Sequence, residues 1–195
     1  MTSILVVCTG NICRSPIAEG MLRDALRARF GDDAPAVSSA GTWGVEGATP
    51  TAEAVSAALE RGFDISAHRA RRLAQVALAD ADLVIAMAGE HRDVLADEMG
   101  VGERAFTLKE LVRLLESLPS VPPRAGPGSL PGRIEQAHAA RRAGFAGNPL
   151  DDDVADPIGM PLQTYRATAW ELDEWIVRLV DGLYGAVPIA AAGGG

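Results

Sequence analysis

The stretch SILVVCTGNICRSP, residues 3–16, decides how the chain begins to fold. Ser3–Val7 is an apolar run of strand length, and apolar residues recur at helical spacing from Pro16 onward. Cys8 and Arg14 lie in the loop between them, and Ser15 is expected to cap the helix, with Pro16 at its first position. In a parallel sheet, the loop from a strand's carboxyl end to a helix is a natural ligand site. A thiol placed there is a candidate for chemistry.

The rest of the chain alternates strand and helix patterns. Short apolar runs predict strands ending near Ala40 and at residues 81–87 and 104–108. Helices are predicted at residues 16–29, at 49–63 with Thr49 or Thr51 as cap, and at 89–100, 109–118 and 161–185. Strands that alternate with helices favour an α/β fold. We therefore predict a single doubly wound domain, with a four-stranded parallel sheet and helices on both faces.

The domain is expected to span residues 1–184, with a flexible Ala/Gly tail at 185–195. A Pro/Gly-rich insert at about residues 117–150 interrupts it and contains a short predicted helix. We interpret most of this insert as a solvated surface loop. The alternative is a basic rim of Arg133, Arg141 and Arg142 that recruits acidic or phosphorylated substrates.

Composition and charge narrow the function classes. The chain is 48% hydrophobic and 23% charged, with 18 basic and 26 acidic residues and a net charge of −8. An acidic chain is not expected to bind nucleic acid or anionic lipid, and no apolar run is long enough to span a membrane. We expect a cytoplasmic protein. The three histidines show no ligand spacing, so neither a metal nor another cofactor is predicted.

The loop after the first strand has the features of an anion site. Gly10 and Asn11 tolerate left-handed backbone, so successive amides can point inward at phosphate oxygens. Arg14 adds a planar, two-pronged donor. The same positive field should hold the pKa of Cys8 well below the free value of about 8.5, and Ser15 can donate a hydrogen bond to the thiolate. A small buried thiol is the structural alternative for Cys8.

A thiolate beneath a bound phosphate can attack phosphorus, and the leaving group then needs a proton. The stretch LDDDVADPIG, residues 150–159, contains the best candidate acid. Asp156 precedes a proline, which keeps its backbone extended or in a turn. Asp151–Asp153 read as a solvated acidic turn, with Asp153 as the fallback acid.

These residues resemble the low-molecular-weight protein-tyrosine phosphatase family. CTGNICRSP matches its phosphate loop, and SSAGTWG, ISAHRAR and DVADP follow in the family's order. The resemblance implies catalytic residues Cys8, Arg14 and Asp156, and a phosphorylated protein as substrate. It implies that the phosphate-binding residues are Thr9, Gly10, Asn11, Ile12, Cys13 and Arg14. Asp156 would also deprotonate the water that hydrolyses the phosphocysteine.

The resemblance further assigns the loop's supports and the substrate cleft. Asn11, Ser15, Ser39 and His68 would support the loop, and Ile12, Trp43 and Ile158 would line the cleft. Ile158 departs from the aromatic residue found in many family members, which removes one wall against a phosphotyrosine ring. Cys13 matches a second loop cysteine, and we hypothesise a reversible disulfide with Cys8 that protects the thiolate from irreversible oxidation.

Three other functions compete with this assignment. A protein-arginine phosphatase of the same family is the nearest, because the segments at 81–100 and 106–112 also resemble those enzymes. They carry threonine where this chain has Ile12, which favours phosphotyrosine here. A related arsenate reductase would need cysteines after Cys13, and the sequence has none. A non-catalytic phosphate-binding module would have no use for Cys8 or Asp156.

Overall fold

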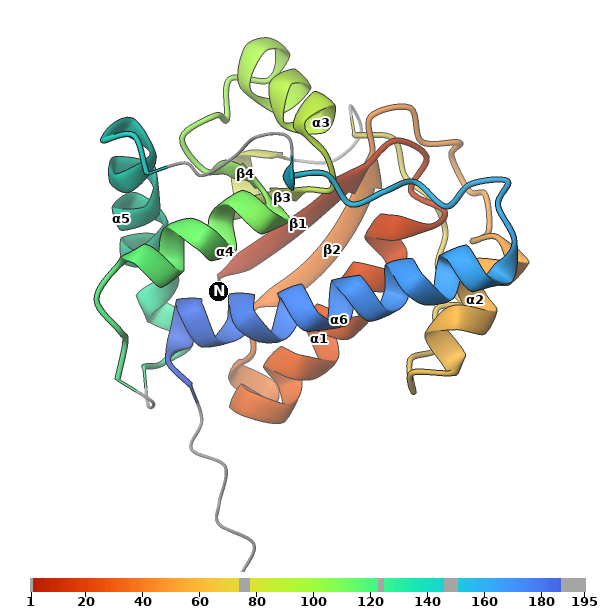
Figure 1. The fold of residues 1–195 in the computed structure, drawn as a ribbon, viewed down its shortest axis with the longest axis horizontal. Helices are drawn as coiled ribbons and strands as arrows, with labels where there is room; N and C mark the ends of the chain where they lie inside the picture. The colour runs from red at the N-terminus through yellow and green to blue at the C-terminus, as the bar shows by residue number, and fades with distance from the viewer. Residues whose placement is uncertain (1, 74–77, 123–124, 146–150, 187–195) are drawn as a thin grey trace, which may run out of the picture.

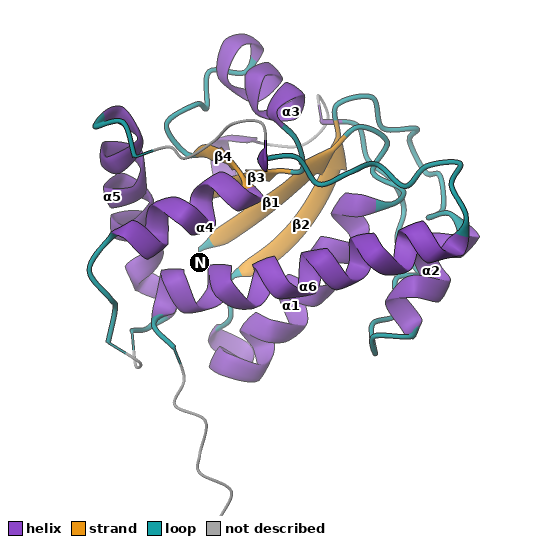
Figure 2. Ribbon diagram, in the orientation of Figure 1, coloured by secondary structure: helices purple, strands orange, loops and turns teal. Residues whose placement is uncertain are grey.

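The computed structural model describes residues 2–73, 78–122, 125–145 and 151–186. Its strands form one parallel sheet in the order β2-β1-β3-β4 (Figures 1 and 2). The strands are β1 (Ser3–Cys8), β2 (Ala36–Gly41), β3 (Leu83–Ala86) and β4 (Ala105–Thr107). The predicted α/β class with a four-stranded parallel sheet is confirmed.

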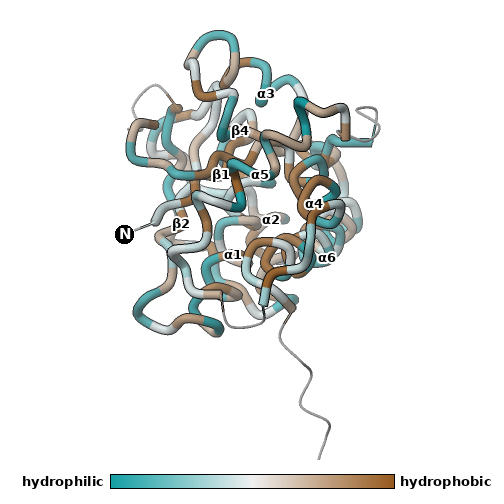
Figure 3. Tube along the Cα trace, turned by 90° about the vertical axis from the view of Figure 1, so that its left-hand side faces the viewer, coloured by the Kyte–Doolittle hydropathy of each residue, from teal (hydrophilic) through white to brown (hydrophobic). Residues whose placement is uncertain are grey.

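Helices lie on both faces of this sheet. The longer ones are α1 (Arg14–Phe30), α2 (Ala52–Leu59), α4 (Leu108–Ser117), α5 (Leu130–Arg142) and α6 (Leu162–Tyr184). α1, α4 and α6 lie on one side, whereas the short α3 (Gly89–Asp93), which continues as a π-helix at Val94–Glu98, lies on the other (Figures 1 and 3). None of the helices within the described ranges is long and apolar enough to cross a membrane. The cytoplasmic location stays a prediction.

Alternation along β1 builds a core on each face. Ile4 and Val6 join the larger apolar cluster beneath α1, α4 and α6, because residues two apart in a strand share a face. Leu5 and Val7 join a smaller cluster on the opposite face, which also contains Leu95 of the π-helix. β1 is therefore buried on both sides, and Figure 3 shows its hydrophobic colour in the interior. The loop after β1 therefore starts from a central strand of the sheet.

The prediction that Ser15 caps the first helix is wrong. α1 begins at Arg14, with Cys13 in the N-cap position and no side-chain capping bond. Ser15 lies in the first turn, where its hydroxyl contacts Cys8 Sγ. For α2 the sequence left Thr49 and Thr51 as alternative caps. Thr51 is the cap in the structure, because its side chain accepts a hydrogen bond from the Ala54 amide.

The interpretation of the insert as a solvated loop is wrong for α5. This helix buries Leu130 and Ile134 in the main core, and it contacts α4 and α6. The basic rim is also wrong. Arg133 is buried and donates to the carbonyls of Gly182 and Leu115, and Arg141 stacks on the Phe106 ring. Arg142 is exposed.

The predicted flexible tail lies outside the described residues from 187 onward.

Candidate active site

The loop between β1 and α1 lies where the sheet's connections diverge. β1 pairs with β2 on one side and β3 on the other, so the chain leaves it at a topological switch point, where α/β proteins bind ligands. Cys8 is the last residue of β1 and Arg14 is the first of α1. The Cys8 and Thr9 carbonyls accept hydrogen bonds from the amides of Thr42 and Trp43, which anchor the loop to the end of β2.

Asn11 holds the loop in its curled shape. Among non-glycine residues of the described chain it alone has a positive φ, of 57°, a conformation that costs energy in most residues. Its side-chain amide donates to Ser15 Oγ at 2.9 Å and to Ser39 Oγ at 2.7 Å. Its side-chain oxygen accepts from the Arg71 amide at 2.9 Å. These hydrogen bonds offset the cost of the positive φ and connect the loop to α1, β2 and the 65–73 segment.

A second layer of contacts supports Asn11. His68 Nε2 lies 3.0 Å from the Asn11 carbonyl, and burial lowers the pKa of His68. Ser39 Oγ donates to Glu19 Oε2 at 2.5 Å, and the same carboxylate lies 3.6 Å from His68 Nδ1. The structure thus brings together the four predicted loop supports, Asn11, Ser15, Ser39 and His68. Glu19 joins them, although sequence reasoning did not single it out.

The loop carries hydrogen-bond donors that are free to meet an anion. Within the part of the chain that the structure describes, none of the backbone N–H groups of residues 9–13 donates to a protein acceptor. Arg14 Nε also has no partner among the described residues, and it is buried. Buried donors are rarely left unpaired unless a ligand or water satisfies them. A row of such amides beside a guanidinium is an arrangement suited to phosphate oxygens.

Arg14 connects the loop to the segment at 152–156. Its Nη1 donates to the Val154 carbonyl at 3.0 Å, and its Nη2 lies 2.6 Å from Asp156 Oδ2. The guanidinium is 4% exposed and the Asp156 side chain 37% exposed, so the pair stands at the boundary of the interior and solvent. Asp156 Oδ1 also accepts from the Ile158 amide at 3.2 Å, an Asx-type turn that fixes the carboxylate.

Eight residues surround a cavity of about 150 Å³ above the loop. They are Cys8, Thr9, Gly10, Ile12, Cys13, Arg14, Asp156 and Ile158. The cavity unites the thiol, the guanidinium and the carboxylate that the sequence singled out. Trp43 lies outside this lining, and its side chain is 76% exposed. Its place in a cleft wall stays a prediction.

The two cysteines have different surroundings. Cys8 Sγ lies 2.9 Å from Ser15 Oγ, whereas Cys13 Sγ lies 3.7 Å from Thr51 Oγ1 and 3.8 Å from the Tyr165 hydroxyl. Burial raises the pKa of Cys13, so its thiol stays protonated more firmly than a free one. Both are free thiols in the structure, and the reversible disulfide stays a hypothesis.

Sequence reasoning missed two residues that contact this site. His91 of α3 is 1% exposed, and its Nε2 lies 2.9 Å from Thr9 Oγ1. Lys109 of α4 donates to the Asp153 carbonyl at 2.7 Å, beside Asp156 in the chain. The sequence did carry a positional signal. His91 follows β3 and Lys109 follows β4, and the carboxyl ends of both strands lie at the same sheet edge as Cys8.

The Asp153 side chain bonds to the backbone of α3. Its Oδ1 accepts from the Gly89 amide at 2.7 Å, at the first residue of α3, and it does not line the cavity. Arg113 pairs with the buried Asp152. These contacts anchor the segment before Asp156 to α3 and α4, so Asp156 rather than Asp153 is the carboxylate at the cavity.

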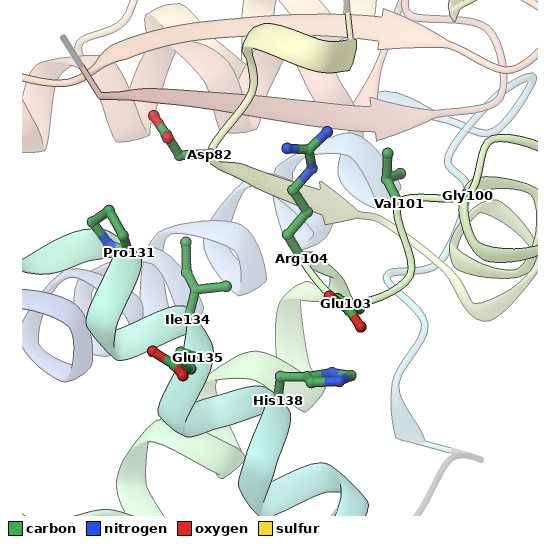
Figure 4. A pocket seen from close by; sticks show the side chains of 9 residues that line it. All are labelled: Asp82, Gly100, Val101, Glu103, Arg104, Pro131, Ile134, Glu135 and His138. Carbon is green, nitrogen blue, oxygen red and sulfur yellow. The ribbon is translucent and has the colours of Figure 1, made fainter.

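A larger cavity of about 480 Å³ lies elsewhere, between α5 and the strand ends opposite the loop (Figure 4). Asp82 and Arg104, which precede β3 and β4, lie on one side of it, and Glu135 and His138 of α5 lie on the other. None of the predicted site residues lines it. Nor do any three His, Cys, Asp or Glu side chains in the described ranges cluster closely enough to hold a metal ion.

Comparison with known proteins identifies the family. The family model described as low molecular weight phosphotyrosine protein phosphatase matches residues 3–117. The chain belongs to this family. The matched segment contains the whole loop from Cys8 to Ser15, whereas Asp156 lies beyond it.

Individual family members divide between two activities. The chain is 30% identical, over 92% of its length and 95% of the relative's, to a protein-arginine-phosphatase of Bacillus subtilis. It is 39% identical, over 56% of its length and 72% of the relative's, to a probable low molecular weight protein-tyrosine-phosphatase of Ralstonia solanacearum. The family thus includes enzymes named for phosphotyrosine and for phosphoarginine.

Solved structures of the family show the same fold. A low molecular weight protein tyrosine phosphatase from T. tengcongensis is 34% identical, with a TM-score of 0.70 over 94% of this chain and 100% of the other. An arginine phosphatase from Geobacillus stearothermophilus is 29% identical, with a TM-score of 0.67 over 94% of this chain and 93% of the other. Structural similarity therefore does not separate the two substrates.

Proposed function

We propose that this chain is a protein-tyrosine phosphatase that hydrolyses phosphotyrosine through a phosphocysteine intermediate. The observation that carries the proposal is the cavity where Cys8, Arg14 and Asp156 meet above the unpaired amides of residues 9–13. A nucleophile, a cationic phosphate ligand and an acid are the groups that this reaction needs. A protein that only binds phosphate would need the amides and Arg14 alone.

In the first step the Cys8 thiolate attacks phosphorus, and the bond from phosphorus to the tyrosyl oxygen breaks. Asp156 in its protonated form gives its proton to that departing oxygen. The loop amides and Arg14 hold the three remaining phosphoryl oxygens as charge moves onto them. In the second step Asp156 removes a proton from water, the water oxygen bonds to phosphorus, and the S–P bond breaks to restore the thiolate.

Ser15 and Arg14 hold the two reacting side chains, Cys8 and Asp156, in place for these two steps. The Ser15 hydroxyl, 2.9 Å from Cys8 Sγ, can donate to the thiolate both before attack and as it leaves. Arg14 holds Asp156 at 2.6 Å. When a phosphate dianion enters, the guanidinium gains a second anionic partner beside the carboxylate.

The walls of the cavity favour an aromatic substrate. Ile12 and Ile158 line it with aliphatic side chains; Ile158, which is 50% exposed, supplies apolar surface although it lacks the aromatic ring found in many family members. A phenyl ring buries apolar surface against such walls, whereas the charged guanidinium of phosphoarginine gains little from them. This chemistry supports phosphotyrosine.

Phosphoarginine is the second candidate substrate, and a specific observation favours it. The Bacillus subtilis protein-arginine-phosphatase matches this chain over 92% of its length, including the region of Asp156. Asp156 is also a carboxylate beside the cavity that can pair with a substrate guanidinium.

The deciding experiment measures phosphate release from a phosphotyrosyl peptide and a phosphoarginyl peptide of the same sequence context, with Cys8→Ser as the blank. We expect a higher kcat/KM for phosphotyrosine, and an Ile12→Thr variant that shifts the ratio towards phosphoarginine. Preference for phosphoarginine in the parent enzyme would establish the second candidate. No release from either peptide, with phosphate still bound, would identify a non-catalytic phosphate-binding module.

A further inference from the structure

Thr9 and His91 form an interaction beside the cavity that the two-step mechanism leaves unused. Thr9 Oγ1 lies 2.9 Å from His91 Nε2 and accepts a hydrogen bond from Arg14 Nη2 at 3.3 Å. Thr9 lines the cavity next to Cys8. His91 is 1% exposed. Within the described residues, it reaches the cavity through its contact with Thr9.

The surroundings of the imidazole decide which ring nitrogen carries the proton. Burial, together with the charge of Arg14, lowers the pKa of His91 to about 4, so the ring is neutral at pH 7 with one N–H. Nε2 faces two acceptors, Thr9 Oγ1 at 2.9 Å and Glu90 Oε1 at 3.4 Å. Nδ1 is buried without a partner. Because an orphaned buried N–H is rarer than an orphaned acceptor, the proton belongs on Nε2.

This tautomer fixes the direction of the Thr9 hydroxyl proton. A hydroxyl oxygen has two acceptor lone pairs and one proton to donate. His91 and Arg14 both donate to Thr9 Oγ1, which occupies the two lone pairs. The hydroxyl proton is then left for a third group, and the side of Thr9 that remains open is the cavity.

We propose that the Thr9 hydroxyl donates a hydrogen bond to a phosphoryl oxygen of the substrate, and that His91 is the positioning residue that orients it. This inference deepens the proposed function and rests on phosphate binding in the cavity. It adds one side-chain donor to the amides and Arg14. It also gives the buried His91 a task that an apolar residue at this place would not perform.

Four variants test the two parts of this inference in the full chain. Thr9→Val removes the hydroxyl at nearly constant volume, whereas Thr9→Ser keeps it. His91→Leu removes the donor, whereas His91→Gln keeps an N–H near the position of Nε2. His138→Leu is the matched control, because His138 lies on α5 beside the remote cavity.

The readout is the affinity for inorganic phosphate by calorimetry, together with kcat and KM for p-nitrophenyl phosphate. A hydrogen bond to a charged group predicts a loss of about tenfold or more in phosphate affinity for Thr9→Val, and most of the affinity kept in Thr9→Ser. His91→Leu should weaken phosphate binding several-fold in the parent chain, with no further loss in the Thr9→Val background. His91→Gln should restore most of the affinity, and His138→Leu should leave it unchanged.

Two outcomes would overturn the inference. One is unchanged phosphate affinity in Thr9→Val; a changed rate of Cys8 alkylation in that variant would then show that the hydroxyl serves the thiol instead. The other is that the losses of His91→Leu and Thr9→Val multiply, which would mean that they act separately. Calorimetry needs no turnover, so a parent chain that binds phosphate but releases none would refute the proposed function and still test this inference.

Discussion

The buried neutral His91 predicts a specific dependence of stability on pH. Its pKa is about 4 in the folded protein and 6.5 in the unfolded chain. Between these values the unfolded state binds more protons, so the free energy of unfolding rises with pH in this window and is fully gained above pH 6.5. The contribution is lost as pH falls from 6.5 to about 4.

The magnitude follows from the gap between the two values. At about 1.4 kcal/mol for each pH unit, the window from 6.5 to about 4 amounts to roughly 3 kcal/mol. With a urea m-value of about 1–3 kcal/mol per M, this corresponds to a fall of about 1 M or more in the unfolding midpoint. His91→Gln has no titrating group at this position and should lose less stability over the same range.

The assay is urea unfolding followed by circular dichroism at pH 7, 6, 5 and 4.5, for the parent chain and for His91→Gln. His68 and His138, whose pKa values are also lowered by burial, titrate in both proteins and cancel in the difference. We expect the two stability curves to converge as the pH falls. Parallel curves across the window would show that His91 titrates alike in both states, and would refute the reasoning from burial.

Three further perturbations test the geometry of the site. Asp156→Ala should slow hydrolysis of aryl phosphates with poor leaving groups about a hundredfold more than those with good ones; equal losses in the kinetics would move the acid to Asp153 or elsewhere. Gly41→Ala should lower both thermal stability and activity, because its new Cβ would collide with the backbone of the loop after β1; a variant with the parent's melting temperature and kcat would contradict the close approach. Lys109→Met should remove the hydrogen bond to the Asp153 carbonyl and slow poor leaving groups several-fold, whereas Arg178→Met, which breaks an exposed ion pair, should not.

Local patterns were sufficient for the elements that form the site. The apolar run of β1, the helical spacing of α1 and the residues between them predicted a strand, an anion-binding loop and a helix, because each depends on neighbours in sequence. Asp156 was selected for the same reason, since the proline after it restricts its backbone, and its role as the acid stays a prediction. The loop supports were assigned through the family resemblance and not from the residues alone.

Contacts between distant segments were not predictable from the sequence. The sequence left open a basic rim that includes Arg133 and Arg141. In the structure both guanidiniums donate to backbone carbonyls, and that of Arg141 also stacks on the Phe106 ring. For His91 the sequence gave only its position after β3, and not its contact with Thr9, which is 82 residues away in the chain. Gly41 needs to be glycine only because the loop after β1 passes against it. Each depends on tertiary packing, which local patterns do not encode.

The most direct test of the central claim is the mass of the protein after rapid acid quench of a reaction with p-nitrophenyl phosphate. The Asp156→Ala variant is the protein to use, because the loss of the base slows hydrolysis of the intermediate. The account predicts one added phosphoryl group on the peptide that contains Cys8, and none in a Cys8→Ala, Asp156→Ala double variant, which has no nucleophile at this position. A parent chain that releases phosphate while Cys8 stays unmodified at every quench time, or an equal rate in Cys8→Ser, would contradict it.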